Sequence, residues 1–159
     1  MIQAYLESIK YVGHLWPLAL IRIVIGYQYL SLVFSRLQMG YLEHAYITER
    51  LILSDNPASS GFYFEMLKAL VQGQWLFMTY LLLIFEVVIG LSYVTGFLVR
   101  IGSLMGIFLS LHLYWFFDFA GSPGQIYMLY IHILFCLLGA GRCLGFDYYF
   151  FKSRRGILW

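Results

Sequence analysis

Four long apolar runs dominate this chain, covering about residues 14–37, 74–98, 101–119 and 125–146. A helix that crosses a membrane needs about 20 mainly apolar residues, so each run is long enough to do so. Only 11% of the residues are charged, whereas soluble domains contain about 25%. The sequence therefore predicts an all-α fold, a four-transmembrane-helix bundle that forms a single integral membrane domain over residues 1–159.

The links between the runs predict how the bundle is oriented. Only the first link is long, at residues 38–73, and within it we expect a surface helix at 41–53 and a helix at 62–71 that leads into the second run. Cytoplasmic loops carry an excess of Lys and Arg. We therefore expect cytoplasmic termini, an extracytoplasmic 38–73 segment and a plasma or inner membrane. With both termini on one side, the basic residues divide into Lys10, Arg100, Arg142, Lys152, Arg154 and Arg155 there, against Arg36, Arg50 and Lys68 on the other side.

Composition and cysteine spacing narrow the range of partners and cofactors. The net charge of +2 gives no reason to expect a nucleic-acid partner. Cys136 and Cys143 stand seven residues apart on one predicted helix, too far apart to form a disulfide with each other. A CxxC redox pair and a cysteine metal cage are absent, and no flavin, iron–sulfur or dinucleotide motif is present.

One ionisable residue lies near the middle of each apolar run. Counted from the basic residues at the cytoplasmic side, their predicted depths are roughly 15–21 Å at about 1.5 Å per residue. An unpaired charge in hydrocarbon costs several kcal/mol, so such groups face the bundle interior and find partners. We expect Arg22 to bind Glu86, with Gly26 and Gly90, one turn from each, bringing the two helices close together. The four residues of this layer are Arg22, Glu86, His112 and His132.

Two interpretations of this layer stay open. In one, Arg22 and Glu86 form a structural ion pair that sets the register of their helices, and the histidines are core residues whose hydrogen bonds are made within the protein. In the other, the layer is a polar pocket for the head group of a lipophilic molecule such as a quinone. Haem ligation by His112 and His132 fits their depth but has no second supporting feature, and a zinc site has less support still.

Several motifs resemble those of a known family of membrane proteins. "LIRIVIGYQYLSLVFSRL" is similar to the R-x3-G…K/R opening of DoxX/DoxD-like proteins, "FEVVIGLSYVTGFLVR" to their E-x3-G-x5-G-x3-R second span, and "LLGAGRCLGFD" to their closing signature. "NPASSGFYFEMLKAL" resembles the DoxD branch, the small subunit of thiosulfate:quinone oxidoreductase. The chain departs from the family at Val33 and Arg36. The motif positions are Arg22, Gly26, Glu86, Gly90, Gly96, Arg100, Gly141, Arg142 and Asp147.

The resemblance implies a four-helix subunit of a membrane redox complex, and our leading hypothesis is a subunit of a quinone-linked oxidoreductase or electron-transfer complex. Its electron donor is another protein or a small reductant that arrives at the 38–73 side, and its other partners are further complex subunits and lipids. Whether this subunit is itself catalytic stays open. The alternative is a non-catalytic structural subunit; a small transporter is disfavoured because no apolar run is visibly broken by Gly/Pro pairs. The catalytic candidates are Glu86, Arg22, His112 and His132, and the candidates to line a quinone pocket are Tyr29, Gly26, Gly90 and Tyr130.

Overall fold

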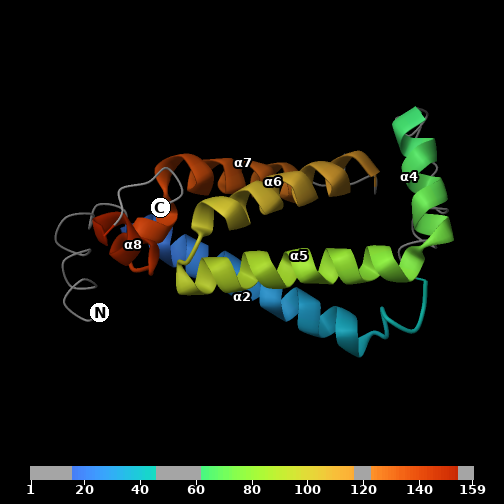
Figure 1. Cartoon of the computed structure of the whole chain (residues 1–159), viewed down its shortest axis with the longest axis horizontal. Helices are drawn as coiled ribbons and strands as arrows, with labels where there is room; N and C mark the ends of the chain where they lie inside the picture. Colours follow the sequence, from blue (N-terminus) through green and yellow to red (C-terminus); the bar gives the residue numbers. More distant parts are fainter. Residues whose placement is uncertain (1–15, 46–61, 117–122, 154–159) are drawn as a thin grey trace.

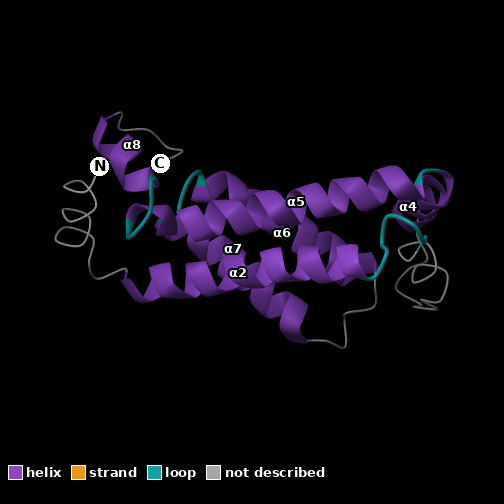
Figure 2. Cartoon of the chain, turned by 90° about the horizontal axis from the view of Figure 1, so that it is seen from below, coloured by secondary structure: helices purple, strands orange, loops and turns teal. Residues whose placement is uncertain are grey.

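The structure is a computed structural model that describes residues 16–45, 62–116 and 123–153. Within these residues the chain is helical and contains no strand, which confirms the all-α prediction (Figure 2). Helices α2, α5 and α6 begin and end within a few residues of the predicted runs, whereas α7 ends at Leu138, eight residues before the end of the predicted run 125–146. The elements are α2 (Trp16–Gln38), α4 (Phe62–Gly73), α5 (Trp75–Thr95), α6 (Val99–Phe116), α7 (Pro123–Leu138), the short 3₁₀ helix η4 (Ala140–Arg142) and α8 (Asp147–Ser153).

The four longest apolar helices pack lengthwise on one another. Helix α2 packs against α5, α5 against α6, and α6 against α7. The start of α2 and all of α8 lie at one end of this bundle, which we call the α8 end (Figure 1). Helix α4 lies at the opposite end, the α4 end, and runs across the bundle rather than along it (Figure 1).

The surface between the two ends is apolar. Helices α2 and α5 are long and apolar enough to cross a membrane. Only 28% of the most apolar 18-residue stretch of α2, and 33% of that of α5, is buried inside the protein. The core helix of a soluble protein would be mostly buried, so this exposure favours a lipid environment. Helices α6 and α7 contain shorter apolar stretches, Val99–Leu113 and Ile126–Leu138. The two long apolar helices therefore support a membrane protein. That all four helices cross the membrane stays a prediction.

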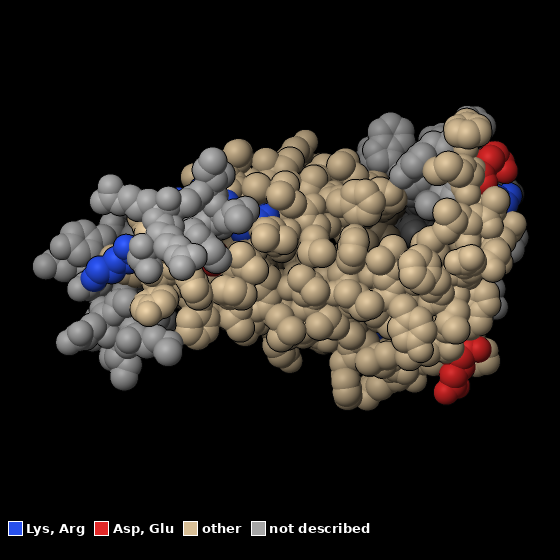
Figure 3. All heavy atoms as spheres, viewed as in Figure 1, with Lys and Arg blue, Asp and Glu red and all other residues tan. Residues whose placement is uncertain are grey.

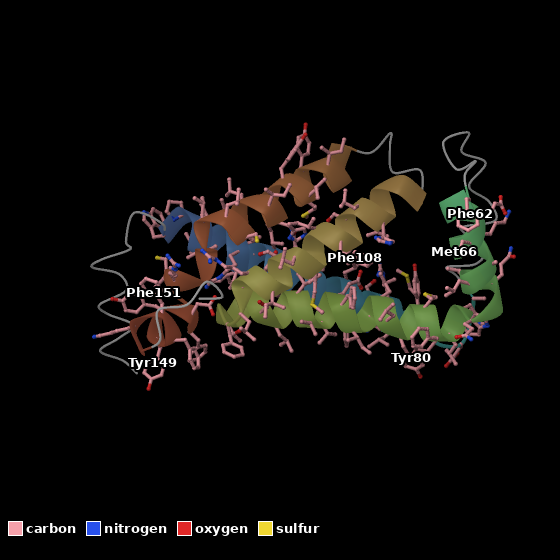
Figure 4. All side chains as sticks on the ribbon, turned by 45° about the horizontal axis from the view of Figure 1, so that its top comes forward. Phe62, Met66, Tyr80, Phe108, Tyr149 and Phe151 are labelled. Atoms are coloured by element: carbon pink, nitrogen blue, oxygen red, sulfur yellow. The ribbon has the colours of Figure 1, made fainter. Side chains whose placement is uncertain are left out.

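Charged and aromatic side chains are distributed as a membrane environment requires. On the face seen in Figure 3, Lys, Arg, Asp and Glu lie at the α4 end and over the half of the bundle next to the α8 end, and the rest of the surface is uncharged. Tyr80 and Tyr149 are about half exposed, at 48% and 50%, and point away from the bundle (Figure 4). Phe62 and Met66 on α4 and Phe151 on α8 mark the two ends in the same view. Aromatic residues favour the interfaces of a membrane.

Helix α4 confirms the helix expected at 62–71, whereas the helix expected at 41–53 is not found where the structure describes that segment. Residues 41–45 form turns, and 46–53 lie outside the described residues. The exposed residues Phe62, Met66 and Leu70 lie four apart on α4 and so share one face. This gives α4 an apolar stripe at the end of the bundle.

Helices α2 and α5 approach closely at two glycines. A Cβ atom on Gly26 would lie 2.8 Å from the backbone nitrogen of Val94 and 2.9 Å from the carbonyl oxygen of Gly90. A Cβ on Gly90 would lie 2.8 Å from Leu30 Cγ. The predicted close contact at Gly26 and Gly90 is therefore confirmed, and it determines which residues of the two helices lie at the same level.

Candidate functional site

A buried ion pair joins α2 to α5, and its cation is Arg36. Arg36 Nη1 donates a hydrogen bond to Glu86 Oε1, with the two side chains 15% and 1% exposed. The Arg36 guanidinium also lies 5.5 Å from the centre of the Tyr41 ring. The expected pairing of Arg22 with Glu86 is therefore wrong, although Glu86 is buried and paired as predicted.

The contact between the two glycines explains this correction. Arg22 lies four residues before Gly26 on α2, and Glu86 lies four residues before Gly90 on α5. Because these helices run in opposite directions (Figure 1), the two displacements point to opposite ends of the bundle. At about 1.5 Å per residue, Arg22 and Glu86 are separated by roughly 12 Å along the axis.

Arg22 instead fastens α2 to the loop that follows α7. Its side chain is fully buried, and its guanidinium donates to backbone carbonyl oxygens. Nη1 lies 2.6 Å from the oxygen of Ala140 and 3.3 Å from that of Cys143, and Nη2 lies 2.9 Å from that of Leu144. A Cβ on Gly96 would lie 2.8 Å from Nη1. Glycine at that position thus leaves room for the guanidinium.

Asp147, the first residue of α8, joins the same region to the start of α6. Its Oδ1 accepts from the backbone nitrogen of Leu98 at 2.7 Å, and its Oδ2 accepts from that of Val99 at 3.1 Å. These contacts cap the start of α6, where carboxylates are favourable. Burial raises the pKa of Asp147 above its ordinary value, although these amide donors oppose the shift. A Cβ on Gly141 would lie 2.0 Å from Oδ2, so only glycine fits there.

A small cavity opens beside the Arg36–Glu86 pair. Its volume is about 130 Å³, close to the roughly 150 Å³ of an apolar protein cavity that accommodates benzene. Glu86 Oε2 is buried and accepts no hydrogen bond within the described part of the chain. The cavity therefore combines room for one ring with an unsatisfied acceptor. It is lined by Gln28, Tyr29, Leu32, Arg36, Glu86, Leu113 and Met128.

Tyr29 connects this cavity to a chain of hydrogen bonds across the bundle. Its hydroxyl lies 2.8 Å from Nε2 of the fully buried His132. The other ring nitrogen, Nδ1, lies 2.6 Å from the hydroxyl of Tyr93. That hydroxyl lies 3.2 Å from Ser103 Oγ, which donates to the carbonyl oxygen of Val99 at 2.7 Å. We call Tyr29, His132, Tyr93 and Ser103 the polar relay.

Sequence reasoning missed Arg36, Tyr93 and Ser103. Arg36 stands at the position where the opening motif usually has Lys, and this basic position was the signal that could have placed it inside the bundle. Tyr93 follows Glu86 by seven residues, which puts both on one face of α5. Ser103 carries no signal of this kind, because a serine one turn into an apolar helix is ordinary.

The remaining predicted residues do not join the cavity. His112 Nδ1 bonds to the carbonyl oxygen of Phe108 on its own helix, and the two rings lie 4.0 Å apart. Tyr130 is 61% exposed on the outer surface of α7. Gly26 and Gly90 pack the two helices together and do not line the cavity. The expected layer of four ionisable residues at one depth is therefore wrong. The expected ligand pair of His112 and His132 is also wrong, because the hydroxyl groups of Tyr29 and Tyr93 hydrogen-bond to both ring nitrogens of His132.

Comparisons with protein-family models, curated proteins and solved structures give no match to this chain. The resemblance to DoxX/DoxD-like proteins therefore stays a prediction from the motifs. The motif positions Arg22, Gly96, Gly141 and Asp147, far apart in sequence, meet in one cluster at the α8 end. There Arg22 hydrogen-bonds to carbonyl oxygens that follow α7, and Asp147 accepts from the amides at the start of α6.

Proposed function

We propose that this protein is an integral-membrane subunit of a quinone-linked oxidoreductase or electron-transfer complex. The supporting observation is the cavity of about 130 Å³, where a buried ion pair leaves one carboxylate oxygen of Glu86 without a partner. The cavity has the size of a single ring, and its wall offers groups that hydrogen-bond to oxygen substituents. Leu32 at its edge is 41% exposed, which provides an apolar route for a lipid tail.

The chemistry that these residues supply concerns protons and orientation. Arg36 is permanently charged, and its hydrogen bond to Glu86 favours the ionised form of that carboxylate. A carboxylate at the head group accepts a proton when a quinol is oxidised and returns it when a quinone is reduced. The described residues offer no redox group, so the electrons come from another protein or a small reductant. We further propose that the complex is of the type that the DoxX/DoxD-like motifs suggest.

The proposal includes four membrane spans with cytoplasmic termini. Helix α6 packs lengthwise on α5 and α7 packs on α6, so a bilayer that covers α2 and α5 also covers them (Figure 1). The α8 end carries Arg100, Arg142 and Lys152, whereas the α4 end carries Glu43, Glu65 and Lys68. Basic residues favour the cytoplasmic side.

Filling the cavity tests this function. Leu32→Trp introduces a bulky ring at the cavity edge, and we expect it to weaken binding of a decyl-substituted benzoquinone to the purified protein at least tenfold. Leu20→Trp is the matched control, because Leu20 is similarly exposed on the same helix (46%) and does not line the cavity. Equal loss of binding in both variants, or no loss in either, contradicts a quinone site in this cavity.

A non-catalytic structural subunit is the second candidate function, and the broad exposed apolar surface favours it because larger membrane subunits can pack there. Glu86→Gln separates the two functions when introduced into the complex purified from native membranes. In a quinone site, the assembled complex loses most of its quinone turnover. In a structural subunit, turnover per assembled complex stays normal, and Glu86→Ala reduces the amount of complex instead.

A further inference from the structure

The polar relay has a single consistent arrangement of its hydrogen atoms. A carbonyl oxygen accepts only, so the one proton of Ser103 belongs to the bond with Val99. Ser103 must then accept from Tyr93, which uses the only hydroxyl proton of Tyr93. His132 Nδ1 must therefore carry a hydrogen and donate it to Tyr93.

The state of the cavity end follows from the charge of His132. The two ring nitrogens of this fully buried histidine hydrogen-bond to phenols, not to carboxylates. An imidazolium there would be an isolated buried charge that costs several kcal/mol, so the ring is neutral. A neutral ring with its hydrogen on Nδ1 has an acceptor at Nε2, and Tyr29 must donate to it. Every donation in the relay thus points away from the cavity.

This arrangement decides which hydrogen bonds the cavity offers to a ligand. Tyr29 donates its one hydroxyl hydrogen to His132 Nε2, so it offers the cavity only the acceptor side of its oxygen. Ionised Glu86 is an acceptor only, and its Oε2 is buried without a partner in the described residues. Arg36 is a donor, but its bond is equally available to a quinone carbonyl and to a quinol hydroxyl.

We propose that the cavity binds the reduced, hydroxyl-bearing quinol in preference to the oxidised quinone. This inference rests on the proposed function of the cavity. A quinol hydroxyl donates to Glu86 Oε2 and accepts from Arg36, so it satisfies both. A quinone has no hydrogen-bond donor, so Glu86 Oε2 stays without a partner when a quinone is bound. The lone pairs of the quinone carbonyl oxygen and of the carboxylate oxygen then repel each other. The site favours the quinol side of the couple.

Binding of the two redox forms to the same protein tests the inference. The wild-type protein in lipid nanodiscs is titrated anaerobically with a decyl-substituted benzoquinone and with the quinol made from it. A hydrogen bond to a charged group predicts a dissociation constant at least about tenfold lower for the quinol. A tenfold preference raises the midpoint potential of the bound two-electron couple by about 30 mV.

The outcomes separate this inference from the function beneath it. Equal affinities, or tighter binding of the quinone, overturn the preference and leave the quinone site standing. Binding of neither form overturns both. Glu86→Gln, which adds an amide donor, is expected to remove the preference, whereas Glu65→Gln on the exposed surface of α4 is expected to keep it.

The direction of the relay has its own test, which needs no ligand. Solid-state ¹⁵N NMR of histidine-labelled protein in bilayers distinguishes a protonated ring nitrogen from an unprotonated one, and a His132→Gln spectrum identifies the signals of His132. We expect hydrogen on Nδ1 and none on Nε2. Hydrogen on Nε2 would make Tyr29 an acceptor from His132, free its proton for a quinone carbonyl and overturn the argument.

Discussion

Arg36 near the end of α2 binds Glu86 in the middle of α5, and the two side chains form one wall of the cavity. Glu86 lies four residues before Gly90 on α5, and Arg36 lies ten residues after Gly26 on α2, so the pair joins the helices on the α4 side of the glycine contact. It also explains how the chain keeps a carboxylate among apolar residues, because an ion pair carries no net charge into the hydrocarbon.

Removing the cation of this pair should lower the free energy of unfolding more than removing both charged residues. Arg36→Met leaves Glu86 buried without its partner, and we expect a loss of about 3–5 kcal/mol in the free energy of unfolding. The double variant Arg36→Met/Glu86→Leu should recover a large part of this loss. Denaturant unfolding in detergent micelles measures both, and a loss below about 1 kcal/mol for Arg36→Met would contradict a buried pair.

The glycine contact predicts a difference between two alanine substitutions. Gly26→Ala sets a methyl group against the backbone of α5, which cannot move aside, so we expect a loss of about 1–3 kcal/mol. Gly90→Ala meets the flexible side chain of Leu30 and should lose less. The control is Gly73→Ala, because a Cβ there has no neighbour within 4 Å. Equal stability of all three variants would argue against the α2–α5 packing.

Arg22 is expected to matter for stability and not for the cavity. Arg22→Lys replaces a planar fork that reaches three carbonyl oxygens with a single ammonium group. We expect a loss of at least about 1.5 kcal/mol in the free energy of unfolding. Quinone binding by the folded protein should stay within twofold of wild type. A decrease in binding as large as that of Glu86→Gln would show that Arg22 belongs to the ligand site.

Asp147 is expected to stabilise the start of α6. Asp147→Ala removes the acceptor of two backbone N–H groups, and the loss of such a cap costs about 0.5–2 kcal/mol. Hydrogen exchange should become faster at the amides of Leu98 and Val99 before it changes in the middle of α6. Unchanged protection of these two amides would contradict the capping role.

Labelling of single cysteines tests the four spans. Glu65→Cys, Gly124→Cys and Lys152→Cys place a thiol on α4, at the start of α7 and on α8, in a background with Cys136→Ala and Cys143→Ala. With four spans, an impermeant maleimide added outside right-side-out vesicles labels positions 65 and 124 and spares 152. If only α2 and α5 cross the membrane, position 124 behaves like 152 instead.

The sequence by itself determined the long helices of this chain and their apolar character. Runs of about 20 apolar residues form helices in hydrocarbon because every backbone polar group must be satisfied within the helix. The burial of Glu86 and the contact between Gly26 and Gly90 also followed from local patterns, since a carboxylate avoids lipid and glycines permit close packing.

Only the tertiary structure decided which polar residues meet. Depth counted along the chain from Lys10 put Arg22 beside Glu86, but the described part of α2 begins at Trp16, and depth in one helix carries no information about its register with the next. That register comes from packing at Gly26 and Gly90, and because α2 and α5 are antiparallel, the same contact that joins the helices moves Arg22 and Glu86 apart. As a result, Glu86 pairs with Arg36, and Arg22 donates hydrogen bonds to carbonyl oxygens of the segment that follows α7.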